Sequence, residues 1–200
     1  NQGETDETNN VRAVPITLTV PDLIVVSATA PAVADAGGTI EVSWTVTNQG
    51  SVLAPADWYD IIYLSDDAVF DGSDDQLTSP YISAETPLAA GASYTRTQNV
   101  TISGYEIPSG NRYLLIYTDS PRFGNDQQRE SDETNNVLAI PIEIRSPDLI
   151  VTDLTAPAAA KPGQEIEISW RVQNTGSGAA SQNWYDFVAI SEDQELDCPY

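Results

Sequence analysis

Residues 38–48, GTIEVSWTVTN, alternate apolar and polar side chains along their whole length. The apolar set, which falls on one face of an extended chain, is Ile40, Val42, Trp44 and Val46. A period of two residues is typical of a β-strand with one buried face. The alternation returns downstream in residues 164–174, QEIEISWRVQN, with the apolar set Ile166, Ile168, Trp170 and Val172. The sequence therefore predicts a half-buried strand in both places.

Further short segments with the same period lie on either side of this strand, separated by glycine and proline residues. The predicted strands cover 22–29, 38–48, 58–65, 92–102, 111–118 and 136–144, with a short one near 76–83. About seven short strands without helical periodicity predict an all-β fold, an antiparallel β-sandwich of immunoglobulin or fibronectin type. We expect Trp44 and Trp58 to fill the space between its two sheets.

The chain repeats itself at an offset of 126 residues. Residues 5–74 laid over residues 131–200 without a gap give 35 identities in 70 positions. This predicts a tandem array whose units each form one sandwich. The expected division is the C-terminal strand region of a preceding repeat in residues 1–20, a complete repeat in 21–146 and the first part of the next repeat in 147–200. We therefore expect the chain to be a segment of a longer array.

The composition is strongly acidic, with 30 acidic and 8 basic side chains and a formal net charge of −22. Nucleic acid binding needs clustered lysine and arginine, so we expect no nucleic acid partner. No apolar run approaches the roughly 18 residues of a membrane span, so we expect no membrane insertion in this segment. The chain has no histidine and a single cysteine, which removes the usual zinc ligands and general bases.

Several motifs run along the unit: PDLIV at 21–25, SWTVTNQGS at 43–51, SWRVQNTGS at 169–177, YLSDDAVFD at 63–71, LAAGASYTRT at 88–97 and ESDETNNV at 130–137. Together they resemble the CARDB family, the cell adhesion related domain found in bacteria. The resemblance covers the whole 126-residue unit in the right order. It implies an immunoglobulin-like sandwich carried in long secreted or surface-anchored arrays, with a role in adhesion.

A first acidic cluster follows the strand predicted at 58–65. Its members are Asp66, Asp67, Asp71, Asp74 and Asp75, and the second copy retains Glu192, Asp193 and Asp197. Calcium takes six to eight hard oxygen ligands, and carboxylates this close would repel one another without a counter-ion. The cluster therefore predicts a calcium site. The alternative is a solvated connecting loop, in which aspartate and serine side chains bond to their own backbone.

A second acidic cluster lies just before the last strand of the unit. It contains Glu130, Asp132, Glu133 and Asn135. In an immunoglobulin-like sandwich this strand start lies beside the end of the preceding strand, at Asp119, and near Asp57 and Asp60. We expect these oxygens to gather at one pole as a second calcium site. The alternative is an Asx-turn, whose side chains cap backbone amides.

The function that these features predict is non-enzymatic. We expect an extracellular structural and adhesive array, secreted or on the bacterial surface, stabilised by calcium and forming a rigid stalk or filament. Its expected partners are neighbouring repeats, and surface glycans or other cells. A first alternative is a carbohydrate- or ligand-binding module of a larger secreted protein, which a coplanar, solvent-facing row among Tyr59, Tyr63, Tyr81, Tyr113 and Tyr117 would favour. A second is a fibre subunit that assembles by strand exchange between chains.

Overall fold

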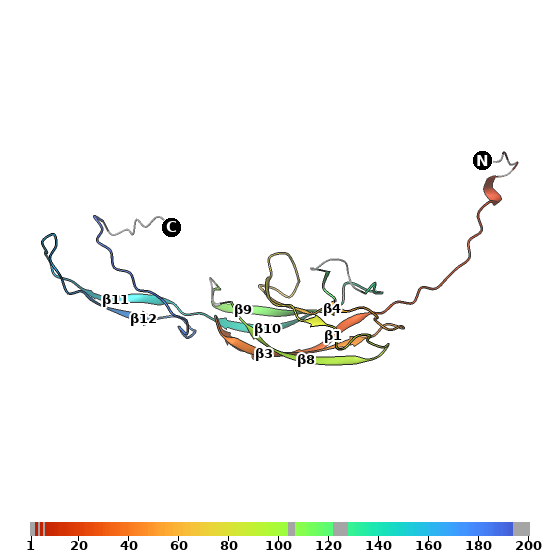
Figure 1. The fold of residues 1–200 in the computed structure, drawn as a ribbon, viewed down its shortest axis with the longest axis horizontal. Coiled ribbons are helices and arrows are strands. Elements are labelled where there is room, and N and C mark those ends of the chain that lie inside the picture. The colour runs from red at the N-terminus through yellow and green to blue at the C-terminus, as the bar shows by residue number, and fades with distance from the viewer. Residues whose placement is uncertain (1–2, 4, 6, 104–106, 122–127, 194–200) are drawn as a thin grey trace.

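The computed structural model describes residues 3, 5, 7–103, 107–121 and 128–193. Figure 1 shows three parts: an extended N-terminal segment, a β-sandwich and a C-terminal piece with two strands. The N-terminal segment contains one short 3-10 helix, Glu7–Asn9, and no strand among its described residues. The sandwich confirms the predicted all-β fold for residues that begin at Pro21.

The first sheet contains three antiparallel strands in the order β1-β3-β8. Their bounds are Leu23–Thr29 for β1, Thr39–Asn48 for β3 and Ser93–Thr101 for β8. Strand β3 has the burial pattern that the alternating sequence predicts, and Trp44 at its centre is only 1% exposed. The outer face of this sheet is polar, with hydroxyl pairs such as Thr45 and Thr95 bonded across the strands at 2.8 Å.

The second sheet contains five strands in the order β2-β10-β9-β5-β6. Their bounds are Val33–Asp35 for β2, Val137–Arg145 for β10, Gly110–Tyr117 for β9, Ile61–Ser65 for β5 and Asp75–Thr78 for β6. Strand β2 pairs with β10 in parallel, the exception at this edge in an otherwise antiparallel sheet. After β1 the chain leaves the first sheet and enters the second sheet as β2. Because β2 has only three residues, the sequence shows no period of two there.

Two predicted strands are each divided in the structure. The segment 58–65 forms β4, Trp58–Tyr59, and β5, with Asp60 between them. The segment near 76–83 overlaps both β6 and β7, Tyr81–Ile82. The division follows from pairing, because β4 pairs with β7 whereas β5 pairs with β6 and β9.

The core lies between the two sheets and confirms the expected packing of the tryptophans. Both Trp44 and Trp58 are buried among aliphatic side chains from both sheets. A second, smaller cluster lies on the outer face of the five-stranded sheet, where Ile61, Tyr63 and Leu115 are buried. Phe70 from the loop after β5 covers this cluster, with its ring centroid 4.8 Å from that of Tyr63.

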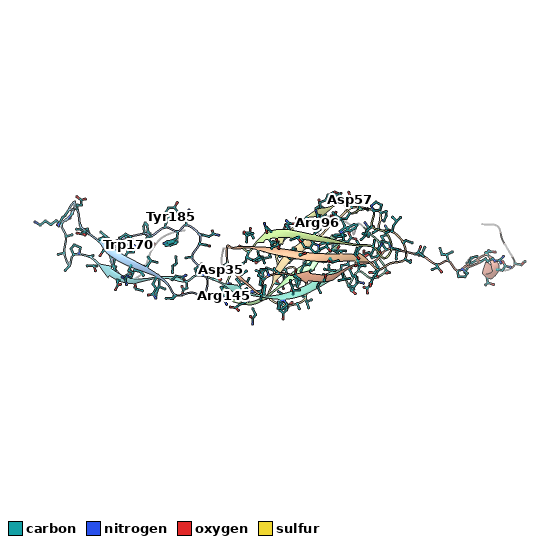
Figure 2. The ribbon with its side chains drawn as sticks, turned by 90° about the horizontal axis from the view of Figure 1, so that it is seen from below. Asp35, Asp57, Arg96, Arg145, Trp170 and Tyr185 are labelled. Carbon is teal, nitrogen blue, oxygen red and sulfur yellow. The ribbon has the colours of Figure 1, made fainter. Side chains whose placement is uncertain are left out.

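The C-terminal piece pairs β11, Leu149–Thr155, with β12, Ser169–Asn174. Leu149 lies opposite Asn174, as Leu23 lies opposite Asn48 in the sandwich. The register shifts between Val25 and Ser27 in one strand pair and between Val151 and Asp153 in the other, so the two strand pairs match at the 126-residue offset. Trp170 is 40% exposed here, whereas the matching Trp44 is buried. Figure 2 shows Trp170 and Tyr185 in this piece, away from the body of the sandwich.

Candidate functional site

Asp60 occupies the interior of the sandwich, so the prediction that it joins a calcium site at the pole is wrong. The interruption between β4 and β5 turns its carboxylate into the core, where the residue is fully buried. Oδ2 accepts hydrogen bonds from Trp44 Nε1 and Tyr94 Oη, both at 2.7 Å. Oδ1 accepts hydrogen bonds from Trp58 Nε1 at 3.2 Å and Thr118 Oγ1 at 2.8 Å.

Burial raises the pKa of Asp60, and the four hydrogen bonds oppose that change. Burial, and next the Asp60 charge, likewise raise the pKa of the Tyr94 hydroxyl. The second copy keeps one part of this arrangement, since Trp170 Nε1 donates to Asp186 Oδ2 at 2.8 Å. The Asp60 carboxylate therefore accepts hydrogen bonds from both core tryptophans, which is a structural role. The sequence did not indicate this role, because an aspartate is expected at the surface.

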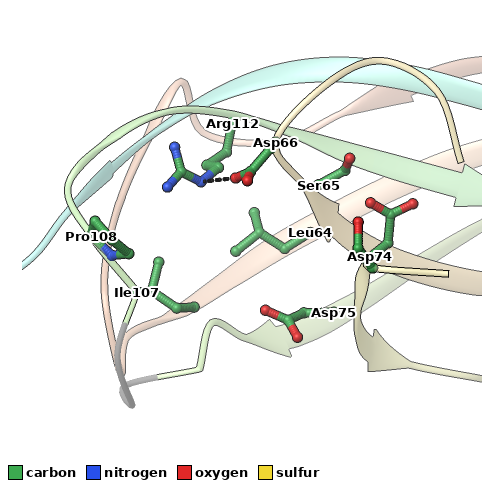
Figure 3. Close-up of a pocket in the computed structure, with 9 residues that line it drawn as sticks. Leu64, Ser65, Asp66, Asp74, Asp75, Ile107, Pro108 and Arg112 are labelled. Atoms are coloured by element: carbon green, nitrogen blue, oxygen red, sulfur yellow. Dashed lines mark ion pairs between the residues drawn. The ribbon is translucent and has the colours of Figure 1, made fainter. Parts of the chain in front are cut away.

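The first predicted acidic cluster surrounds an open pocket of about 280 Å³ at the end of β5 (Figure 3). Asp66, Asp74 and Asp75 line it on the side of the acidic loop and β6. Ile107, Pro108 and Arg112 complete the lining, and Arg112 Nε forms an ion pair with Asp66 Oδ1 at 2.7 Å. The pocket is therefore of mixed charge.

Most carboxylates of this loop accept hydrogen bonds from the loop itself. Asp67 Oδ1 accepts from Val69 N at 2.7 Å, and Asp71 Oδ1 accepts from Ser73 N at 2.7 Å. The Ser73 hydroxyl also donates to Asp71 Oδ1. The hydrogen bonds from the Ser73 hydroxyl and amide lower the pKa of Asp71. Asp74 Oδ2 accepts from the Asp71 amide at 2.8 Å. The contacts match the turn alternative, in which the acids hold the loop's own backbone.

The acids of the second copy are placed only in part. Glu192 and Asp193 are exposed, and Ser191 Oγ donates to Asp193 Oδ1 at 3.2 Å. Asp197 lies outside the described residues, as does Cys198.

Three members of the second predicted cluster, Asp119, Glu130 and Asn135, lie at one end of the sandwich, where the N-terminal segment joins β1. We call this end the N-terminal pole and define it by Asp22, Asp119, Ser120, Gln128, Glu130, Asn135 and Asn136. Glu130 Oε1 accepts from Leu23 N at 2.8 Å, and Glu130 Oε2 accepts from Asn136 Nδ2 at 2.7 Å. Glu130 therefore ties the first residue of β1 to the residue before β10.

Asp119 and Asp22 hold the rest of this pole together. Asp119 has a positive φ of 46° at the end of β9, and its Oδ2 accepts from Gln128 N at 2.9 Å. Asp22 Oδ1 accepts from Asn135 Nδ2 at 3.0 Å, and Asp22 Oδ2 accepts from Ser131 Oγ at 2.8 Å. The loop before β10 is thereby fastened to the start of the unit.

Three predicted members of the second cluster have other roles. Asp57 accepts hydrogen bonds from the hydroxyls of Tyr81 and Thr86 at the β4–β7 pair. Asp132 Oδ1 accepts from Thr134 N and Oγ1, which lowers the pKa of Asp132 and forms the Asx-turn of the alternative reading. Glu133 Oε1 accepts from Glu130 N at 2.9 Å.

The N-terminal pole also contains buried oxygens that lack a donor. Within the described part of the chain, no hydrogen-bond partner reaches Ser120 Oγ, Gln128 Oε1, Asn135 Oδ1 or Asn136 Oδ1. Gln128 and Asn136 are each 1% exposed and Ser120 is 6% exposed. Burial raises the pKa of Glu130 to about 8, and the nearby charges of Asp119 and Glu133 act in the same direction. The pole is thus buried and rich in oxygen, and its carboxyl groups disfavour one another's negative charge.

Ser120, Gln128 and Asn136 were missed as candidate ligands because neutral side chains carry no charge pattern. A usable signal was present for Asn136, since the sequence DETNNV occurs in both copies. Asn48 was also missed. Its amide accepts from Asp22 N and Gly50 N and donates to Val52 O and Leu88 O, and Asn174 repeats three of these contacts.

The tyrosines do not form the row that would favour sugar binding. Tyr63 is buried, and the rings of Tyr59 and Tyr81 are inclined to each other by 48°. Phe70 packs edge-on against Tyr117 at an angle of 75° between the rings. Tyr59, Tyr63, Tyr113 and Tyr117 belong to the apolar cluster on the outer face of the sheet, rather than to a flat platform.

Among the described residues, no three histidine, cysteine, aspartate or glutamate side chains are grouped so that they could hold a metal ion. No helix in the same residues has the length and apolar character needed to cross a membrane.

The other end of the sandwich touches the second copy. We call it the C-terminal pole and define it by Ala36, Gly37, residues 107–109 and Ser146. Ser109 Oγ lies 3.0 Å from Ser177 Oγ and accepts from Ser146 N at 2.9 Å. Gly178 N donates to Ser146 O at 3.0 Å. A Cβ placed on Gly37 would lie 2.5 Å from Gln182 Nε2, so the Gln182 side chain packs directly over this glycine.

Solved structures similar to the chain include the CARDB domain of a Pyrococcus furiosus protein in complex with di-metal ions. It shares 19% identity with a TM-score of 0.46, and the match covers 66% of this chain and 94% of that one. A solution structure of the same domain gives 17% identity and a TM-score of 0.45, with 64% and 97% covered. A β-glucosidase from Listeria innocua gives 13% identity and a TM-score of 0.41, over 62% of this chain and 16% of the enzyme.

No curated protein matches the chain. The family model named CARDB matches residues 20–140, which include β1 and the first four residues of β10. That span is more than half of the chain and contains Asp60 and the whole N-terminal pole. The chain therefore belongs to the CARDB family, a family of non-catalytic, adhesion-related domains.

Proposed function

We propose that the chain is a structural part of an extracellular adhesive array in which consecutive units are held at fixed angles and stabilised by calcium. Each sandwich acts as a rigid bead, and the array acts as a stalk or filament that presents other parts of the protein. The acidic surface keeps such an array soluble and attracts divalent cations.

The observation that carries this proposal is the contact between the sandwich and the second copy. Only Ser146 separates β10 from Pro147, and its amide and carbonyl both bond to neighbouring loops. Its hydroxyl donates to Ile107 O at 2.5 Å, so three polar groups of one residue are fixed. A free linker would leave these groups to water. Here the amide and hydroxyl of Ser146 bond within the C-terminal pole, and its carbonyl accepts from Gly178 N.

The start of each copy is built in the same way, which supports a repeated joint. Gly50 and Gly176 match at the 126-residue offset, and a Cβ on either would collide with backbone of the Pro-Asp segment that enters the unit. The Asn48 contacts with that segment return at Asn174. Glycine at this position lets two backbone segments approach closely. Two copies thus share one way of holding the incoming chain.

Residual dipolar couplings test the proposal on the chain itself. We expect amides of β1 and β3 and amides of β11 and β12 to fit one alignment tensor. The double variant Ser109→Ala, Ser177→Ala removes the hydroxyl contact across the joint and should reduce the couplings of β11 and β12 relative to those of the sandwich. Ser93→Ala, which removes a hydroxyl pair within the first sheet, is the matched control. Two independent tensors in the unaltered chain would contradict a fixed joint.

A further inference from the structure

We propose that the N-terminal pole is the calcium site, formed by the carboxylates of Asp119 and Glu130 and the neutral oxygens of Ser120, Gln128 and Asn136. The inference rests on the calcium stabilisation within the proposed function and gives it a place. It assigns the site to this pole, and away from the acidic loop of residues 65–75.

The buried oxygens without donors carry the inference. Ser120 Oγ, Gln128 Oε1 and Asn136 Oδ1 are oxygens at least nine-tenths buried with no hydrogen-bond partner in the described residues. A buried polar atom left unsatisfied costs about 1–3 kcal/mol. Three such atoms in one small region therefore need a hydrogen-bond donor or a cation, and the two carboxylates beside them favour a cation.

Printed contacts hold these oxygens next to two carboxylates. Gln128 is fixed by its amide bond to Asp119 Oδ2 and by Nε2 donating to Ala56 O at 2.6 Å. Asn136 uses its Nδ2 on Glu130 Oε2, which leaves Oδ1 for another partner. The hydrogen bond made by each amide nitrogen therefore fixes the orientation of the amide group, and each amide oxygen remains without a hydrogen-bond partner among the described residues.

The charge of the pole selects a cation over a neutral guest. Asp119 and Glu130 contribute two carboxylates close enough for the charge of one to affect the other. Arg112 is paired with Asp66 in the other predicted cluster, and Arg145 is paired with Glu143 at the far end of β10. A divalent ion would neutralise the two carboxylates.

The kind of ligand selects calcium. All the candidate ligands are oxygens, and three of the five are neutral amide or hydroxyl groups. Calcium accepts such mixed oxygen sets in irregular geometry, whereas magnesium retains several waters and zinc prefers nitrogen and sulfur. In the acidic loop of residues 65–75, by contrast, no buried side-chain oxygen lacks a hydrogen-bond partner among the described residues.

Calorimetric titration of the whole chain with calcium chloride, after removal of metal by a chelator, tests the site. We expect Asp119→Asn to abolish the binding heat. Ser120→Ala removes an oxygen that has no hydrogen-bond partner among the described residues, so it should weaken calcium binding about tenfold or more without lowering the melting temperature in chelator. Asp71→Asn, in the exposed acidic loop, is the control and should bind as the unaltered chain does.

The possible outcomes separate the two proposals. If Asp71→Asn loses binding while Ser120→Ala and Asp119→Asn keep it, calcium stabilisation stands and its assignment to the N-terminal pole is overturned. If the unaltered chain shows neither binding heat nor a rise in melting temperature, both the site and the calcium part of the proposed function are overturned. Ser120→Ala decides the matter even if Asp119→Asn does not fold.

Discussion

At the scale of single residues, Asp60 shows how a surface-type side chain becomes part of a core. The sequence WYD places it beside two aromatic residues, and the structure uses it to accept bonds from Trp44, Trp58, Tyr94 and Thr118. An indole N–H buried in a core needs an acceptor, and a carboxylate supplies two oxygens for several donors. Burying one acid thus allows two tryptophans to pack between the sheets.

Replacing Asp60 by alanine should lower the free energy of unfolding by about 2–5 kcal/mol, because the buried Trp44 indole N–H and the hydroxyls of Tyr94 and Thr118 lose their acceptor. Asp60→Asn should cost less, since its oxygen can still accept from Trp44 and its nitrogen can donate to Thr118. Urea denaturation followed by tryptophan fluorescence measures both. Asp75→Ala, on the exposed edge strand β6, is the control and should change stability by no more than about 0.5 kcal/mol. Equal losses for Asp60→Ala and Asp75→Ala would refute the role of the network.

The stability of the chain should also depend on pH through Asp60. Its pKa is raised on folding, so the stability contributed by the bound proton is present below the unfolded pKa near 4 and is lost as the pH rises toward the folded value. The free energy of unfolding of the unaltered chain minus that of Asp60→Asn should therefore fall as the pH rises from 4. Urea titrations at pH 4 to 8 measure this difference. A difference that rises over the same range would show that the carboxylate is favoured as the charged form.

Sequence reasoning worked for residue types and failed for their partners. It placed Asp119, Glu130 and Asn135 at one pole correctly, because strand order brings the end of β9 to the start of β10. It could not place Asp60, since a single residue between β4 and β5 changes the face to which a side chain points. It also overlooked Gln128 and Asn136, whose importance lies in an unbonded oxygen and not in charge.

At the scale of elements, the acidic loop after β5 is attached to the sheet by an apolar side chain. Phe70 contacts Tyr63 and Tyr117, with centroid distances of 4.8 and 5.1 Å. The acids of the loop then project from a fixed base while they bond to the loop's own amides. The continuous apolar run of β5 does not reveal this outer apolar cluster, because Ile61 and Tyr63 pack outward while Ile62 and Leu64 belong to the core.

Phe70→Ala should release this loop and lower the free energy of unfolding by about 1–2 kcal/mol, as expected for a half-buried aromatic side chain. Hydrogen exchange of amides 67–73 should become faster, since the loop loses its attachment. Val69→Ala, at a position 69% exposed in the same loop, should leave both quantities unchanged. Unchanged exchange in Phe70→Ala would mean that the acids alone order the loop.

Gly50 tests the element that receives the incoming chain. A Cβ at this position would lie 2.6 Å from Asp22 N and from Pro21 C, so the backbone must shift to admit one. Gly50→Ala should therefore lower the free energy of unfolding by about 1–3 kcal/mol. Gly72→Ala is the matched control, because nothing lies within 4 Å of its added Cβ. Equal thermal stability of the two variants would show that this segment does not need a close approach.

The extent of the elements was largely predictable. The periods of two in residues 38–48 and 92–102 correspond to β3 and β8 within one or two residues. The three-residue strand β2 was not, because so short a segment has no detectable period and its parallel pairing with β10 depends on tertiary structure. Pairing with different neighbours also decided where β4 and β5 separate.

At the scale of the whole molecule, the two poles of the sandwich have distinct tasks. The N-terminal pole fastens the loop before β10 to the start of β1 through Glu130 and Asp22. The C-terminal pole contacts the second copy through Ser109 and Ser146. From the net charge of −22 we expect no nucleic acid partner. Two of the acidic side chains, Asp119 and Glu130, lie at the pole that we propose as the calcium site.

The most direct test of a fixed joint is the rotational diffusion of its two sides, measured by ¹⁵N relaxation. Amides of the sandwich and of β11 and β12 should report one common correlation time in the unaltered chain. Inserting four glycines between Ser146 and Pro147 should separate them, with a markedly shorter correlation time for β11 and β12 alone. If the two sides already tumble independently in the unaltered chain, so that the insertion changes nothing, the joint is a flexible linker and the account of a rigid array is wrong.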